Sequence, residues 1–126
     1  MFEFSSIEQY HAQLQEGNVT CLQAVEHYLQ HIHATKHFNA FIEVYAGEAK
    51  EKAKELDEKR ISSGNLTGKL HGVVIRLKDV ICYKDHKISA ASKILKNFTS
   101  IYSATVVERL LAEDAIIIGN LNCDEF

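Results

Sequence analysis

The sequence lacks the features that mark several special classes of protein. Its 126 residues include only three cysteines, which are far apart and form no Cys-x-x-Cys pair, so neither a disulfide framework nor a zinc ribbon is indicated. No uninterrupted apolar run exceeds four residues and the N-terminus is acidic, which argues against a membrane span and a signal peptide. Proline is absent, and the sequence offers no physical reason for that. We therefore expect a cytoplasmic protein.

An excess of positive charge is also missing. Fourteen Lys and Arg residues stand against seventeen Asp and Glu residues, and a net charge of -3 has the wrong sign for a chain whose main task is to bind phosphate backbones. What remains, 46% hydrophobic and 25% charged residues, is typical of globular proteins. The length allows one domain at most.

Residues 1–63 are predicted to be mainly helical. Capping boxes open two helices, one formed by Ser5 with Glu8 and the other by Thr20 with Gln23. Glycine at position 17 can end the first of these helices in a left-handed conformation.

A third helix is predicted over residues 47–61, which are rich in Ala, Lys and Glu. Its sequence offers two favourable i,i+4 ion pairs, Glu48 with Lys52 and Glu55 with Lys59. The preceding segment 38–45 is too short for its period to distinguish a strand from an extended link.

A change of character follows the turn-rich residues 62–68. Residues 73–77 and 115–118 are β-branched runs suited to buried strands, and a helix that opens with a capping box of Thr105 and Glu108 lies between them. Strand, helix and strand in this order predict a βαβ unit. We therefore predict an α/β fold with a parallel sheet that the earlier helices cover.

Lys78 and Asp79 end the first predicted strand. Ligands of open parallel sheets gather at the carboxyl ends of strands, and a lysine there can act as a general base if burial favours its neutral form. From position alone, a surface lysine that simply ends the strand is the commoner case.

Other candidate sites are weaker, and we assign no function to them. His27/His31 and His33/His37 have helical spacing but no third metal ligand, so we predict no metal site. Residues 64–69 lack the spacing of a phosphate-binding loop. The other arrangements considered are a nucleophilic Cys82 paired with His71 or His86, and an acid pair formed by Asp124 and Glu125.

Several segments of the second half carry a resemblance to a known family. Residues 70–79 read LHGVVIRLKD, a Gly-led hydrophobic strand that ends in Lys-Asp, and this resembles the opening of the amidase signature family. ASKIL at 91–95, SATVVERL at 103–110 and IIGNLNCDEF at 117–126 follow in the order typical of that family, although Val74 and Asn120 stand where members commonly carry Pro and Lys. The resemblance covers essentially the whole chain.

The resemblance implies that the chain is the N-terminal part of a single amidase-signature domain, with the helical residues 1–63 followed by the first strand, helix and strand of a mixed sheet at 70–126. Only Lys78 matches a member of the family's Ser–Ser–Lys triad, and both serines are expected beyond residue 126. The 126-residue chain alone is therefore expected to be inactive.

Within the family, the chain is most similar to the glutamine-hydrolysing component of tRNA-dependent amidotransferases. This implies glutamine as substrate, subunits B and C of the complex as partners, and Glu-tRNA(Gln) reached through the complex. ATP and Mg2+ would be used by a partner in the complex, and this chain itself is expected to bind no cofactor. Two alternatives stay open: an amidase for small amides, and a non-catalytic assembly or binding module. Against the module we expect residues 116–118 to form an unpaired hydrophobic edge strand.

Overall fold

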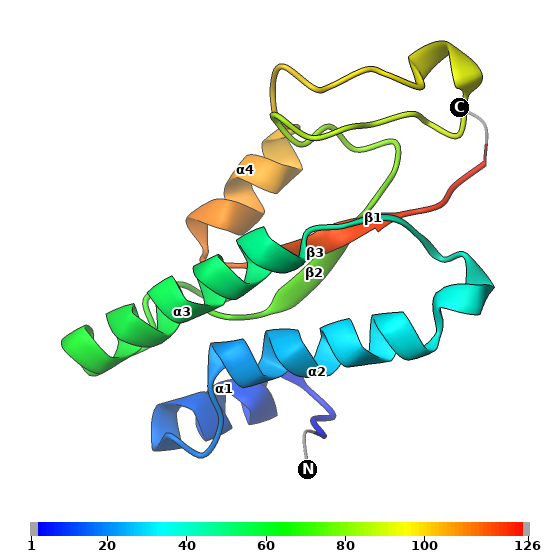
Figure 1. Ribbon diagram of the computed structural model, residues 1–126. Coiled ribbons are helices and arrows are strands. Elements are labelled where there is room, and N and C mark those ends of the chain that lie inside the picture. Colours follow the sequence, from blue (N-terminus) through cyan, green and yellow to red (C-terminus); the bar gives the residue numbers. More distant parts are fainter. Residues whose placement is uncertain (1–2, 125–126) are drawn as a thin grey trace.

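Helices dominate the first half of the chain and a small sheet dominates the second half in the computed structural model, which describes residues 3–124 (Figure 1). In chain order the elements are α1 (Ile7–Glu16), α2 (Cys21–Ala34), η1 (Lys36–Phe38), β1 (Phe41–Val44), α3 (Ala46–Ser63), β2 (Val74–Lys78), η2 (Lys93–Leu95), α4 (Thr105–Ala112) and β3 (Ile116–Leu121).

Local capping fixes where the first two helices begin. The Thr20–Gln23 capping box is confirmed, with Thr20 Oγ1 accepting from the Gln23 N–H at 3.1 Å. The predicted Ser5–Glu8 box is wrong by one residue, because Ser6 caps α1 and accepts from the Gln9 N–H. Gly17 ends α1 with a φ of 78°, as predicted.

Helix α3 buries Ala49, Ala53 and Leu56 and leaves its charged face in solvent. Of the two predicted ion pairs, Glu55–Lys59 forms, with 3.5 Å between the charged atoms. Glu48 does not pair with Lys52, because its carboxylate contacts the His86 ring from a distant segment at 2.8 Å. The contact of Glu48 with His86 thus forms in place of the predicted ion pair with Lys52.

The sheet has the order β1-β3-β2, so it is mixed. Strands β2 and β3 are parallel and joined through α4, which confirms the βαβ unit, while β1 pairs antiparallel with β3. The expectation that residues 116–118 form an unpaired edge is wrong, because β3 is the central strand: Ile116 and Ile117 pair with β2, and Ile118 O accepts from the Tyr45 N–H that follows β1. The predicted Thr105–Glu108 capping box is also wrong, since α4 begins after Ala104 without a side-chain cap.

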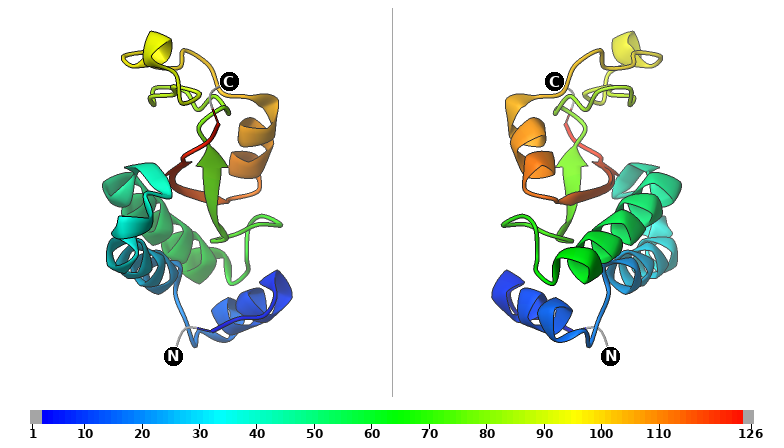
Figure 2. Two further views of the ribbon diagram at one scale, coloured as in Figure 1. Left: turned by 90° about the vertical axis from the view of Figure 1, so that its right-hand side faces the viewer. Right: turned by 90° about the vertical axis from the view of Figure 1, so that its left-hand side faces the viewer.

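Helices lie on both sides of the sheet, with α4 on one side and α2 and α3 on the other (Figure 2). Ile116 and Ile118 join the larger core with residues of α1, α2 and α3, whereas Ile117 packs with Leu77 and Val107 on the α4 side. This is the period of two expected of a strand with both faces covered. Among residues 3–124, no helix is both long and apolar enough to cross a lipid bilayer.

A long irregular excursion, residues 79–104, leaves the carboxyl end of β2 and returns to α4 (Figure 1). Backbone hydrogen bonds hold its two arms together, from Asp85 N to Ser100 O at 2.8 Å and from Ser100 N to His86 O at 2.9 Å. The carboxyl ends of β2 and β3 therefore lie beside a folded excursion.

Candidate active site

Lys78 is the last residue of β2 and lies opposite Leu121 of β3. Its neighbour Leu77 is buried in the core, while Lys78 itself is exposed, as expected for successive residues of a strand. No hydrogen bond or ion pair joins the Lys78 ammonium to another side chain among residues 3–124. Lys78 thus lies at the strand end with an exposed amine, and residues 3–124 do not supply the burial on which its predicted role as a base depends.

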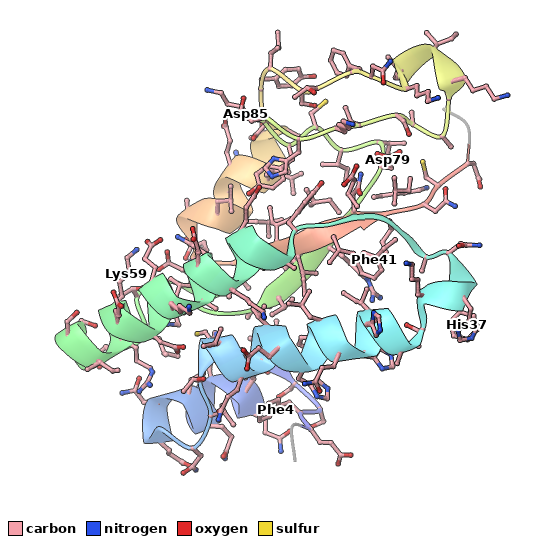
Figure 3. The ribbon with its side chains drawn as sticks, in the orientation of Figure 1. Phe4, His37, Phe41, Lys59, Asp79 and Asp85 are labelled. Carbon is pink, nitrogen blue, oxygen red and sulfur yellow. The ribbon has the colours of Figure 1, made fainter. Side chains whose placement is uncertain are left out.

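Asp79, the next residue, is almost completely buried at 1% exposed and is the centre of a polar cluster (Figure 3). Its Oδ1 accepts from Asn120 Nδ2 at 2.8 Å and from the Ser89 N–H at 3.2 Å, and its Oδ2 accepts from the Ser89 hydroxyl. Asn120 Oδ1 in turn accepts from the Glu43 N–H of β1 at 2.8 Å. One carboxylate therefore connects all three strands and the excursion.

A pocket of about 350 Å³ opens beside this cluster. Asp79, Ser89 and Asn120 contribute to its wall, and lysines of the excursion line it as well: Lys87, Lys93 and Lys96. Ala90 and Ala91 have φ values of 49° and 54°, a conformation that costs a non-glycine residue energy and must be held by its surroundings. The Ala90 N–H donates to the Asp79 carbonyl at 2.9 Å and supplies part of that support.

The structure does not bring Cys82 together with either candidate histidine. His86 stacks on Tyr83 with ring centroids 3.9 Å apart, and its ring nitrogens contact Lys84 O and the Glu48 carboxylate. Cys82 instead interacts with Tyr102 and raises the pKa of that tyrosine. A Cys–His nucleophile is not assembled from these residues.

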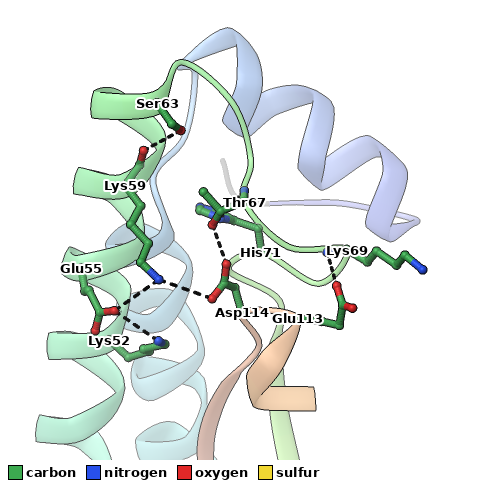
Figure 4. A network of polar contacts seen from close by, with 9 residues as sticks. All are labelled: Lys52, Glu55, Lys59, Ser63, Thr67, Lys69, His71, Glu113 and Asp114. Atoms are coloured by element: carbon green, nitrogen blue, oxygen red, sulfur yellow. Dashed lines mark hydrogen bonds and ion pairs between the residues drawn. The ribbon is translucent and has the colours of Figure 1, made fainter. Parts of the chain in front are cut away.

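His71 lies in a separate buried cluster at the junction of α3 and the start of β3 (Figure 4). The Thr67 N–H donates to its Nδ1 at 3.2 Å, and the Thr67 hydroxyl donates to Asp114, which Lys59 approaches at 3.7 Å. Its Nε2 has no hydrogen-bond partner among the described residues. Burial lowers the pKa of His71, although the charge of Asp114 opposes this.

No group of three or more His, Cys, Asp or Glu side chains within residues 3–124 is arranged to hold a metal ion. Of the predicted acid pair, Asp124 is exposed, and Glu125 lies outside the described residues.

Comparison with known proteins identifies the family of this chain. A family model described as "Amidase" matches residues 23–126. The chain belongs to the amidase signature family. This amidase-signature chain is 42% identical over 124 residues to the glutamyl-tRNA(Gln) amidotransferase A subunit of Chlorobium chlorochromatii, and also 42% identical to that of Chlorobaculum tepidum. It spans 26% of the length of each of these relatives.

The fold of this amidase-signature chain also recurs in solved structures. It superimposes on native peptide amidase from Stenotrophomonas maltophilia with a TM-score of 0.86 and 30% identity, covering 96% of this chain and 25% of the other. The α/β architecture with a small mixed sheet is thus a segment of the amidase-signature fold.

The Asp79 cluster was not found by sequence reasoning. Asp79 was noted only as the neighbour of Lys78, and its partners Ser89 and Asn120 lie ten and forty-one residues away. No fixed spacing joins such residues. Two signals were available, namely an acidic residue directly after a buried strand and an amide near the end of its parallel neighbour.

Proposed function

We propose that this chain is part of the glutamine-hydrolysing subunit of a glutamyl-tRNA(Gln) amidotransferase, and that Lys78 is its catalytic base. The observation that carries the proposal is 42% identity across 98% of the chain to proteins of that name. The position of Lys78 at the carboxyl end of β2, where ligands of such sheets gather, supports the assignment of its role.

The proposed chemistry needs a base because a serine hydroxyl is a weak nucleophile at neutral pH. The neutral Lys78 amine takes a proton through a bridging serine from the nucleophilic serine, whose Oγ attacks the side-chain amide carbon of glutamine. The proton returns to the leaving nitrogen and ammonia departs, which leaves an acyl-enzyme that water hydrolyses to glutamate. Both serines belong to the part of the protein outside this chain.

The proposed partners use the ammonia. Subunits B and C would complete the complex, and one of them would activate Glu-tRNA(Gln) with ATP and Mg2+ before the ammonia attacks. The net charge of -3 fits a division of labour in which this segment is not the main surface for tRNA.

The test uses the intact protein that carries this chain, purified with its partners. Replacing Lys78 with Ala should lower ammonia release from glutamine by about 10²–10⁴-fold, the usual contribution of a general base. Lys84→Ala is the matched control, because Lys84 is an exposed lysine of the same region. Ammonia release that persists in Lys78→Ala would show that another group is the base. The 126-residue chain assayed alone should release no ammonia.

A second candidate is an amidase for small amides, which the likeness to peptide amidase favours. The two functions differ in what the intact protein requires. Hydrolysis of simple carboxamides without partner subunits, at rates above those with glutamine, would establish the second function and reject the first.

A further inference from the structure

Asp79 has a feature that its position after Lys78 does not explain. Its carboxylate is buried, yet no Lys or Arg side chain within residues 3–124 pairs with it. Burying a carboxylate costs free energy unless strong hydrogen bonds replace the lost water. Here those bonds come from Ser89 and Asn120, which between them donate to both of its oxygens.

The arrangement fixes the backbone immediately after Lys78. The Asp79 N–H donates to Leu121 O at 2.9 Å and its carbonyl accepts from the Ala90 N–H at 2.9 Å, so main chain and side chain are both held. On the other side, Leu77 is 4% exposed and packed with Val107 and Ile117. Lys78 therefore projects from a backbone anchored at both neighbours.

We propose that Asp79, through Ser89 and Asn120, is a positioning residue for Lys78. This inference rests on the proposed function, in which Lys78 moves a proton. A base accelerates a reaction only when it lies in hydrogen-bond reach of the group it serves, and a displacement of about 1 Å can cost about 100-fold in rate. The cluster that holds the end of β2 should therefore affect the rate of the chemical step and have little effect on substrate affinity.

The directions of the hydrogen bonds allow a sharp test by exchange. In Asp79→Ala, the Ser89 and Asn120 donors lose their acceptor, whereas Asp79→Asn can keep its carbonyl oxygen toward Asn120 and the Ser89 N–H and donate with its amide to the Ser89 hydroxyl. In Asn120→Asp, two carboxylates face each other and repel. In the double variant Asp79→Asn/Asn120→Asp, the amide at 79 donates to the carboxylate at 120. The Ser89 hydroxyl then still has an acceptor at 79 and the Glu43 N–H still has one at 120, while the Ser89 N–H loses its bond of 3.2 Å.

We expect Asp79→Ala and Asn120→Asp of the intact protein each to lower kcat for glutamine hydrolysis by about 100-fold with KM almost unchanged, Asp79→Asn to keep most of kcat, and the double variant to recover most of the loss of Asn120→Asp. Such a split between kcat and KM marks transition-state positioning rather than binding. Asp85→Asn is the control, because Asp85 lies on the same excursion and Asn tolerates its φ of 65°.

Two further measurements keep the outcomes distinct. In the intact protein, the ¹³Cε and ¹⁵Nζ resonances of Lys78 should shift in Asp79→Ala and in Asn120→Asp and return in the double variant. Ser89→Ala removes one hydroxyl and should shift the Lys78 resonances in the same direction by a smaller amount. This variant provides the test if one of the other single variants does not fold. Variants that lose stability but keep kcat and the Lys78 resonances would overturn the positioning role. Activity that persists in Lys78→Ala would overturn the proposed function instead.

Discussion

At the residue scale, the cluster around His71 makes the stability of the folded state depend on pH. Because the Thr67 N–H donates to Nδ1, that nitrogen carries no proton, and a second proton on the ring would break this bond. Burial, His11 and Arg60 disfavour the charged ring, whereas Asp114 and Asp57 favour it, and the net result is a lowered pKa. The folded chain therefore holds His71 neutral.

This gives a prediction for stability against pH. The pKa of His71 is lower in the folded chain than the ordinary value of 6.5, so below pH 6.5 the unfolded chain binds more protons at this residue. The free energy of unfolding should fall as the pH is lowered from 6.5 toward the folded pKa, and His71→Gln should reduce that fall. Urea unfolding at about pH 5 to 8 measures it. His37→Gln, at an exposed histidine, is the control. If the free energy of unfolding depended on pH equally in the two variants, His71 would not be the source of the effect.

The candidate site was predictable only in part, for reasons visible at individual residues. The position of Lys78 follows from a hydrophobic strand that ends in Lys-Asp, which is local information. Its proposed role as a base depends on serines that we propose lie outside the chain. The hydrogen bonds of Asp79 depend on how the excursion folds back, and a sequence pattern does not encode that.

At the element scale, the N-terminus of α2 is capped twice. Besides the Thr20–Gln23 box, Asp57 of α3 accepts from the Cys21 N–H at 2.8 Å and from the Leu22 N–H at 3.1 Å. The carboxylate also lies at the positive end of the helix dipole. Burial and then the charge of Asp57 raise the pKa of Cys21 to about 12, which keeps this thiol protonated.

The two caps should differ in how much they stabilise the chain. Thr20→Ala removes an exposed cap and should cost about 1 kcal/mol. Asp57→Ala leaves two partly buried N–H groups unpaired and should cost about 2–6 kcal/mol, at about 1–3 kcal/mol for each group left without a partner. Urea unfolding followed by circular dichroism tests this order. Glu58→Ala, on the exposed side of the same helix, should be nearly neutral. A larger loss in Thr20→Ala would contradict the argument.

Local and distant contacts explain which elements were predictable. The Thr20–Gln23 box, the Gly17 stop and the βαβ order all rest on residues near one another in sequence, and they are confirmed. Three features depended on contacts from far away, and these were missed or misjudged. They are the pairing of β1 with β3, the turn of Glu48 toward His86, and the Asp57 cap.

At the scale of the whole molecule, the sheet and the excursion both present surfaces that a small domain usually covers. Among residues 3–124, strand β2 has a neighbour on one side only, and in the excursion Ile94 is 84% and Ile101 80% exposed. The chain spans 26% of the length of its curated relatives, whose remaining three quarters would be available to cover such surfaces. This favours a segment of a larger domain over an independent assembly module.

The two structural interpretations predict opposite behaviour of the isolated chain in solution. Open strand edges and exposed apolar side chains promote association between copies, so light scattering should show a mass that rises with concentration. Ile94→Lys with Ile101→Lys should reduce that association without loss of core packing, because both side chains are largely outside the core. Gln30→Lys adds the same charge at an exposed polar residue of α2 without removing an apolar side chain, and should leave the association nearly unchanged. A monomer at all concentrations that unfolds cooperatively would instead favour the assembly module, because the described surfaces would then need no further covering.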